Sequence, residues 1–234
     1  MKKLFPAIVF LLSALLISSF AQREITPASQ APPPSKQSNS QAEKQPPAGA
    51  AVGLSYGIVV DNSGSYRQIL ERVIEAAKNL VEANTAEDET FLVRFVNSDK
   101  IKLLQDFTAS KNEIHEAADE MFVEGGLTAI LDAIDFSARH LAANAGQDGA
   151  PRAKILVLIT DGDDRQSTVK IENVLKFLKD NQIRVFALGL SEEKVSTRIL
   201  DRLTRETGGK KFVPKTRAEV PAAVQELASA IRAR

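Results

Sequence analysis

The segment 154–160 (KILVLIT), whose five central residues are all apolar, is the feature that most constrains the fold of this chain. Apolar and polar residues do not alternate in it, as they would in a strand with one solvated face, so both faces of the strand are expected to be buried. A similar run occupies residues 56–60. Strands buried on both faces belong to parallel sheets covered by helices on each side, and they predict an α/β domain.

Between these runs the apolar residues recur at helical spacing, which predicts strands and helices in alternation. One predicted helix covers about 110–122 and carries Phe122 on its apolar face, and the next begins at Leu127. We expect a doubly wound, Rossmann-like and mostly parallel sheet of about six strands, with helices on both faces. The short segment 100–105 is predicted to add an antiparallel edge strand. The predicted strands cover residues 54–60, 89–97, 100–105, 154–160, 183–188 and 211–213.

The chain begins with the features of a secretory signal peptide. Lys2 and Lys3 precede a largely apolar run, and a small-residue cleavage site ends at Ala21, so residues 1–21 are interpreted as the leader. The alternative is an uncleaved anchor, which the shortness of the run and Pro6 disfavour. The protein is therefore expected to be exported, to the periplasm or the cell exterior, and to remain tethered to a membrane if the leader is not cleaved.

Residues 22–52 hold six of the ten prolines and are rich in Gln, Ser and Ala. Such a composition buries too little apolar area to fold, and it predicts a disordered linker. Residues 53–234 then form one folded domain, which we expect to be monomeric. The formal net charge is 0, and no basic patch indicates nucleic-acid binding. The chain has no cysteine, which excludes disulfides, thiolate metal sites and a cysteine nucleophile.

Oxygen-bearing side chains follow the two buried runs at the points where they end. Asp61 ends the first run, and Ser63 and Ser65 follow at alternate positions. Asp161 ends the second run, and Thr128 opens a helix. If the two strands are neighbours, these five residues meet at the carboxyl edge of the sheet, where ligands of open α/β domains bind. Such oxygens suit Mg²⁺, Mn²⁺ or Ca²⁺ better than zinc or copper.

These motifs resemble those of von Willebrand factor type A domains. Residues 61–65 (DNSGS) resemble the Asp-x-Ser-x-Ser signature, and residues 125–134 (GGLTAILDAI) resemble the segment that carries the family's metal-site threonine. Residues 159–162 (ITDG) are similar to the second aspartate loop, and residues 203–212 are similar to a late helix-to-strand turn. The resemblance covers residues 53–234, which is all of the predicted folded part.

The resemblance implies a metal-ion-dependent adhesion site. Ser63, Ser65 and Thr128 would be its hydroxyl ligands, and Asp61 and Asp161 would act behind them, often through water. A carboxylate from a protein or peptide partner would complete the octahedron around Mg²⁺, with Mn²⁺ or Ca²⁺ as alternatives. Neutral hydroxyl ligands would leave the cation strongly electrophilic toward an incoming Asp or Glu.

Plainer readings of these residues stay open at this point. Asp61 can simply end a strand, and Ser65 can be a helix N-cap. The acidic residues nearby are interpreted as solvated charges, Asp163 and Asp164 in a loop and Asp132 and Asp135 on a helix.

The predicted function is an exported adhesion or interaction module, and not an enzyme. The chain has no Gly-x-Ser-x-Gly elbow and no Walker loop. A phosphatase-like aspartate would need a second carboxylate two residues on, where Ser63 stands. Two alternatives remain: a structural or assembly domain in which the metal only stabilises the fold, and, less favoured, a metal-dependent phosphoesterase.

Overall fold

The computed structural model describes residues 53–233, and the predictions for the leader (1–21) and the linker (22–52) lie outside these residues. Within the described part, no helix has the length and hydropathy needed to cross a membrane. The strands are β1 (Gly53–Asp61), β2 (Glu89–Phe95), β3 (Ile101–Thr108), β4 (Arg152–Thr160), β5 (Arg184–Gly189) and β6 (Lys211–Phe212). The α-helices are α1 (Leu70–Glu82), α2 (Lys111–Asp119), α3 (Ile130–Asn144), α4 (Ile171–Asp180), α5 (Arg198–Thr207) and α6 (Val220–Arg232), with short 3₁₀ helices η1 (Gly64–Gln68) and η2 (Arg217–Glu219).

The strands form one sheet in the order β3-β2-β1-β4-β5-β6, and only β3 runs antiparallel to its neighbour. This confirms the predicted doubly wound α/β fold, although β3 extends to Thr108, beyond the predicted end of the edge strand. The strand that ends in Asp61, β1, and the strand that Asp161 follows, β4, are direct parallel neighbours, with Val60 opposite Ile159. Their carboxyl ends therefore lie side by side at one edge of the sheet.

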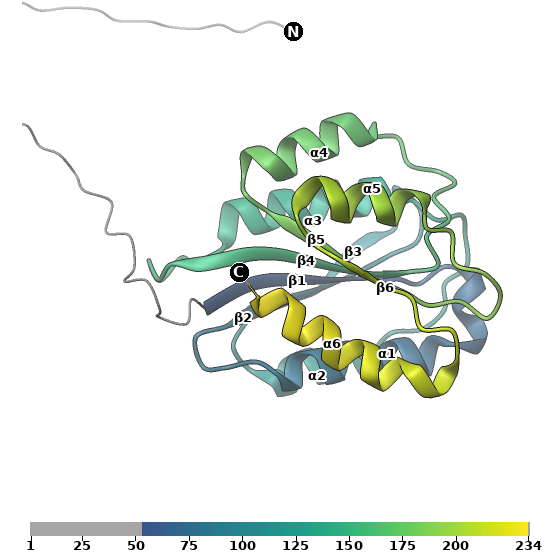
Figure 1. Cartoon of the computed structure of the whole chain (residues 1–234), viewed down its shortest axis with the longest axis horizontal. Coiled ribbons are helices and arrows are strands. Elements are labelled where there is room, and N and C mark those ends of the chain that lie inside the picture. Colours follow the sequence, from purple (N-terminus) through teal and green to yellow (C-terminus); the bar gives the residue numbers. More distant parts are fainter. Residues whose placement is uncertain (1–52, 234) are drawn as a thin grey trace, which may run out of the picture. The chain divides into compact units, whose positions relative to one another are not determined.

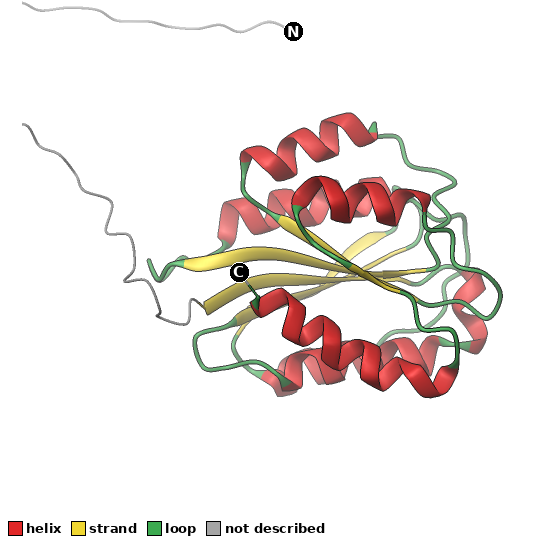
Figure 2. Cartoon of the chain, viewed as in Figure 1, coloured by secondary structure: helices red, strands yellow, loops and turns green. Residues whose placement is uncertain are grey.

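Two helical layers cover the sheet (Figures 1 and 2), with α1, α2 and α6 on one face and α3, α4 and α5 on the other. Alternate residues of β1 face the two layers, so that Ile58 packs in the first core cluster and Val59 in the second. Both side chains are fully buried. Burial of a side chain of this size contributes about 1.5–3 kcal/mol, which is why the apolar runs become the central strands.

One helix boundary differs from the sequence prediction in a way that shapes the site. Helix α2 ends at Asp119 and α3 begins only at Ile130, so residues 121–129 form an extended connection, called here the α2–α3 loop. Gly125 and Gly126 have φ values of 71° and 137°, which a right-handed helix does not allow. Because α2 ends before it reaches Phe122, this side chain, predicted to pack inward from a helix, is instead 60% exposed.

Candidate metal site

Asp61, the last residue of β1, is fully buried and connects the β1 loop to the end of β4. One carboxylate oxygen accepts the backbone N–H of Ser63 at 3.0 Å, and the other accepts the Thr160 hydroxyl at 2.7 Å. Thr160 is the last residue of β4, and its hydroxyl also accepts the N–H of Gly162 at 3.1 Å. Asp61 therefore connects the loop after β1 to the end of β4, which is more than the role of a residue that only ends a strand.

Ser63 and Ser65 present two hydroxyls side by side after β1. Their Oγ atoms lie 3.1 Å apart, with Ser63 almost fully buried and Ser65 exposed. Ser65 lies inside η1, and the residue at the N-cap of this 3₁₀ helix is Ser63, whose side chain makes no capping hydrogen bond. The plainer reading of Ser65 as a helix N-cap is therefore wrong, and neither hydroxyl is occupied in capping.

The α2–α3 loop brings Thr128 to the same edge of the sheet. An added Cβ at Gly64, between the two serines, would lie 3.9 Å from the Cα of Gly125. On the other side, the Thr128 carbonyl accepts the N–H groups of Arg165 and Gln166, at 2.8 and 3.0 Å, from the loop after β4. The loop that carries Thr128 therefore lies against both the serine loop and the second aspartate loop.

Asp161 begins the loop after β4 and is partly exposed. One carboxylate oxygen accepts the N–H of Asp163 at 3.1 Å, and its carbonyl accepts the N–H of Ser196 at 2.7 Å. This turn occupies one of the two carboxylate oxygens. The structure thus brings all five predicted residues to one edge of the sheet, on three loops that contact one another, while their role as metal ligands stays a prediction.

The electrostatics of this edge favour a cation. The pKa of Asp61 is raised to about 7: burial raises it most, the hydrogen bonds from Ser63 and Thr160 partly offset this, and the negative charge of Asp161 adds to the rise. Burial also raises the pKa of Tyr66, and the charges of Asp61 and Asp161 add to this effect. The groups that lower the pKa of Asp61 are neutral donors, so a positive charge at this edge would stabilise the ionised carboxylate.

The donor set fits a hard divalent cation. The two serine hydroxyls lie 3.1 Å apart on the loop that follows Asp61, and each oxygen of Asp61 accepts a hydrogen bond from the protein, so Asp61 supports the loop that carries them. Within residues 53–233, no three His, Cys, Asp or Glu side chains come together as a metal-binding group. The candidate hydroxyl ligands for a cation here are those of Ser63, Ser65 and Thr128.

Two acidic residues that the sequence analysis assigned to solvated positions are structural supports of this edge. Asp164 accepts the N–H of Ile130 at 2.7 Å, at the first turn of α3, and the Ser167 hydroxyl at 2.5 Å. Asp132 is only 7% exposed and accepts the N–H groups of Thr168 and Val169, at 2.9 and 2.8 Å.

These contacts attach the start of α3 to the loop after β4, and thereby hold Thr128 near Asp161. No local pattern identifies the two acids, because the backbone N–H groups that they accept lie more than thirty positions away in the chain. The charge of Asp163, in contrast, is on the surface as expected and pairs with Arg165.

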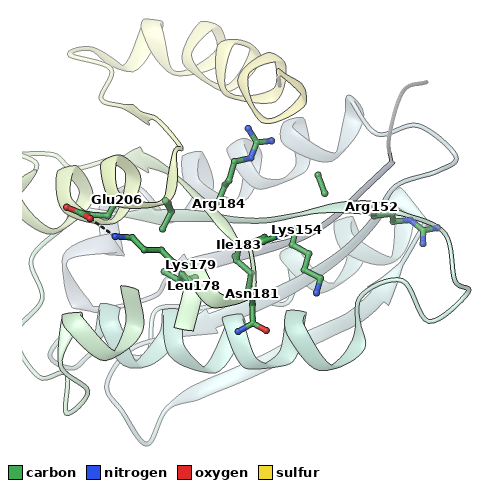
Figure 3. A pocket seen from close by; sticks show the side chains of 11 residues that line it. Arg152, Lys154, Leu178, Lys179, Asn181, Ile183, Arg184 and Glu206 are labelled. Carbon is green, nitrogen blue, oxygen red and sulfur yellow. Dashed lines mark hydrogen bonds and ion pairs between the residues drawn. The ribbon is translucent and has the colours of Figure 1, made fainter. Parts of the chain in front are cut away.

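A cavity of about 510 Å³ lies at the opposite, amino-terminal end of β4 and β5 (Figure 3) and contains none of the five residues. Its basic residues largely have partners: Lys179 pairs with Glu206 at 2.6 Å, and Arg184 donates to the carbonyls of Ile231 and Ala233. Because ligands of open α/β sheets bind at the carboxyl ends of the strands, the candidate functional site is at the edge with Asp61.

This open α/β sheet has three loops at its carboxyl edge that carry serine and threonine hydroxyls, and this combination is typical of one class of binding domain. The model of the von Willebrand factor type A domain matches residues 57–227, and the chain belongs to this family. Domains of this family typically mediate protein interactions and commonly bind a divalent metal at the adhesion site.

Similar proteins include the inter-alpha-trypsin inhibitor heavy chain H2 of Mesocricetus auratus, which is 28% identical over 161 residues. The match covers 64% of this chain but only 17% of that relative. An aerotolerance-related membrane protein from Bacteroides fragilis, solved with multiple mutations to serines, aligns with a TM-score of 0.62 and 18% identity, over 76% of this chain and 98% of that one. Proximal thread matrix protein 1 from the mussel byssus was solved with zinc in its MIDAS motif, the metal-ion-dependent adhesion site. It aligns with a TM-score of 0.64 and 16% identity, over 77% of this chain and 48% of that one.

Proposed function

We propose that this protein is an interaction module that docks a carboxylate of a partner protein or peptide through a bound divalent cation. Ser63, Ser65 and Thr128 would supply hydroxyl ligands, and Asp61 and Asp161 would orient them. The observation that carries the proposal is the pair of serine hydroxyls, 3.1 Å apart, in front of a buried aspartate whose two oxygens are already bonded. A cation with neutral ligands keeps most of its charge, and the carboxylate of an acidic side chain is a favourable oxygen ligand for it in place of one water.

Magnesium is the proposed cation, with Mn²⁺ and Ca²⁺ as alternatives. Mg²⁺ prefers six oxygen ligands and retains several waters, which suits a site with three protein hydroxyls. The zinc in the mussel thread matrix protein belongs to that protein. Competition calorimetry with the four cations would rank them for this chain.

We also propose that the module is exported and has no catalytic role. The leader and linker motifs support export, and the Bacteroides fragilis protein of the same fold is described as a membrane protein. The family's typical role in protein interaction supports the non-enzymatic reading. Detection of the chain in cell fractions, with an antibody against the folded domain, would test the location.

The central test compares Thr128→Ala with Thr128→Ser. The serine variant keeps the hydroxyl, so it should retain most of the Mg²⁺ affinity measured by calorimetry, whereas the alanine variant should lose it. Retention of partners from envelope material in a pull-down should be EDTA-sensitive for the wild type and the serine variant. Full Mg²⁺ binding by the alanine variant would refute the ligand assignment.

One observation favours a second candidate, a structural role for the cation. Asp61 is buried with a raised pKa, so a cation at this edge would relieve an unfavourable carboxylate and stabilise the fold. The wild type in EDTA distinguishes the two functions, whereas Asp61→Ala would also remove the hydrogen bonds from Ser63 and Thr160. Loss of partners from a domain that circular dichroism shows to stay folded in EDTA supports docking, and unfolding of the domain in EDTA at the assay temperature supports the structural role.

A further inference from the structure

The α2–α3 loop exposes two large apolar side chains beside the proposed metal site. Phe122 is 60% exposed and Leu127 is 47% exposed. Only two other large apolar residues of the described part are comparably exposed, Phe136 at 38% and Val213 at 37%. Concentrated exposure of this kind on one loop is a common property of protein-interaction surfaces.

Both residues are fixed next to the predicted cation ligands. Leu127 directly precedes Thr128 in the chain. The carbonyl of Phe122 accepts the side-chain amide of Asn62, which lies between Asp61 and Ser63, and the carbonyl of Asn62 accepts the N–H of Glu124 at 3.4 Å. The two apolar side chains therefore belong to the same edge as the serine hydroxyls.

The loop is held in this conformation by charged contacts. The carboxylate of Glu124 pairs with Arg94, which is buried on β2, and lies 3.6 Å from the ammonium of Lys100. The guanidinium of Arg94 also lies 5.4 Å from the centroid of the Phe122 ring. Because these contacts fix the loop, Phe122 would lose little conformational freedom when a partner covers it. Aromatic side chains that are already held in place bind a partner at a low entropic cost.

We propose that Phe122 and Leu127 form an apolar docking surface that selects partners in which the acidic side chain adjoins a large apolar side chain. The inference rests on the proposed function, since the cation would bind the carboxylate while Phe122 and Leu127 cover the neighbouring apolar group. A cation at this edge is complementary to an acidic partner, and the apolar surface next to it excludes water from the ionic contact, which strengthens it.

The test selects binders from a random peptide library displayed on phage, in Mg²⁺, with elution by EDTA. Selection on the wild type should enrich Asp or Glu with Phe, Leu, Ile or Trp next to it. Selection on the Phe122→Ser/Leu127→Ser double variant should enrich acidic residues without the apolar neighbour. A selected peptide should bind each single variant about tenfold more weakly than the wild type, as expected for the loss of one buried apolar side chain.

Phe136→Ser is the matched control, because it removes an exposed aromatic ring from α3 and should leave peptide affinity unchanged. Calorimetry with Mg²⁺ alone should give the same affinity for all variants, which shows that the metal site is intact. Enrichment of acidic peptides with no apolar neighbour on the wild type would overturn this inference and leave carboxylate docking standing. Failure to enrich acidic peptides at all, with Mg²⁺ bound, would overturn both.

Discussion

The substitution Ser65→Ala separates a cation ligand from a structural residue with little interference from folding. Ser65 is exposed, and the one contact of its hydroxyl described above is with the Oγ of Ser63 at 3.1 Å. Removal of an exposed hydroxyl of this kind is expected to change the free energy of unfolding by no more than about 0.5 kcal/mol in EDTA. The same hydroxyl is predicted to bind the cation, so its loss should appear only when Mg²⁺ is present.

The size of the effect follows from the linkage between binding and folding. At a Mg²⁺ concentration a hundred times the wild-type Kd, the cation adds about 2.7 kcal/mol to the free energy of unfolding. Loss of a group that supports a metal site commonly weakens binding tenfold to a hundredfold. A hundredfold loss would leave the variant with only about 0.4 kcal/mol of stabilisation, which is about 2.3 kcal/mol less than the wild type. For a domain of this size, the difference corresponds to about 5–9 °C in melting temperature.

The assay is a pair of thermal unfolding curves, in EDTA and in Mg²⁺, for the wild type, Ser65→Ala and the control Ser229→Ala. Ser229 is an exposed serine on α6 whose hydroxyl donates to the carbonyl of Gln225 at 2.9 Å, so it matches Ser65 in exposure but not in position. Only Ser65→Ala should lose the Mg²⁺-dependent rise. An equal Mg²⁺-dependent rise in the melting temperature of all three proteins would refute the assignment of Ser65. If the melting temperature of Ser65→Ala lies below that of the wild type by the same amount in EDTA as in Mg²⁺, the role of Ser65 is structural.

Two further predictions concern the scaffold around the site. Gly162→Ala should lower the free energy of unfolding by about 2–5 kcal/mol in urea titrations, because the new Cβ would lie 1.9 Å from the Ser196 carbonyl oxygen at a φ of 82°. The control Gly149→Ala has a similar φ of 76° but no atom within 4 Å, and should cost only about 1 kcal/mol; equal losses would contradict the steric argument. Burial raises the pKa of Asp88, but hydrogen bonds led by that from Arg232 outweigh it and hold the pKa below the ordinary 3.8. The stabilisation by Asp88 is then present above about pH 4 and lost as the pH falls through the lower native pKa, so Asp88→Asn should flatten this part of the acid unfolding curve, and an unchanged curve would contradict the assignment.

The sequence predicted the architecture because the burial pattern is local information. The runs that became β1 and β4 lack polar residues over their central positions, and only a sheet covered on both faces buries such strands completely. The positions of Asp61 and Asp161 at strand ends could be predicted for the same reason. Their adjacency required only that β1 and β4 be neighbours, which the sheet order confirms.

The supports of the site could not be predicted, because they depend on which loops meet. Asp132 lies in the first turn of α3, and nothing in its own helix shows that the N–H groups of Thr168 and Val169 approach it. Phe122 was expected to face inward because its spacing continues that of α2. The helix ends at Asp119, and the following loop bonds to Asn62 and Arg94, which leaves the ring outside the core.

The sequence by itself therefore determined the class of fold, the edge at which a ligand is predicted to bind, and the oxygen chemistry of the five candidate residues. These properties follow from the hydrophobic pattern and from residue type, both of which act over a few neighbouring positions. The tertiary structure decided which loops contact one another, how Asp61 and Asp164 hold them, and which apolar side chains surround the site. Hydrogen bonds between residues far apart in the chain set these features, and they form only once the sheet has brought the strand ends together.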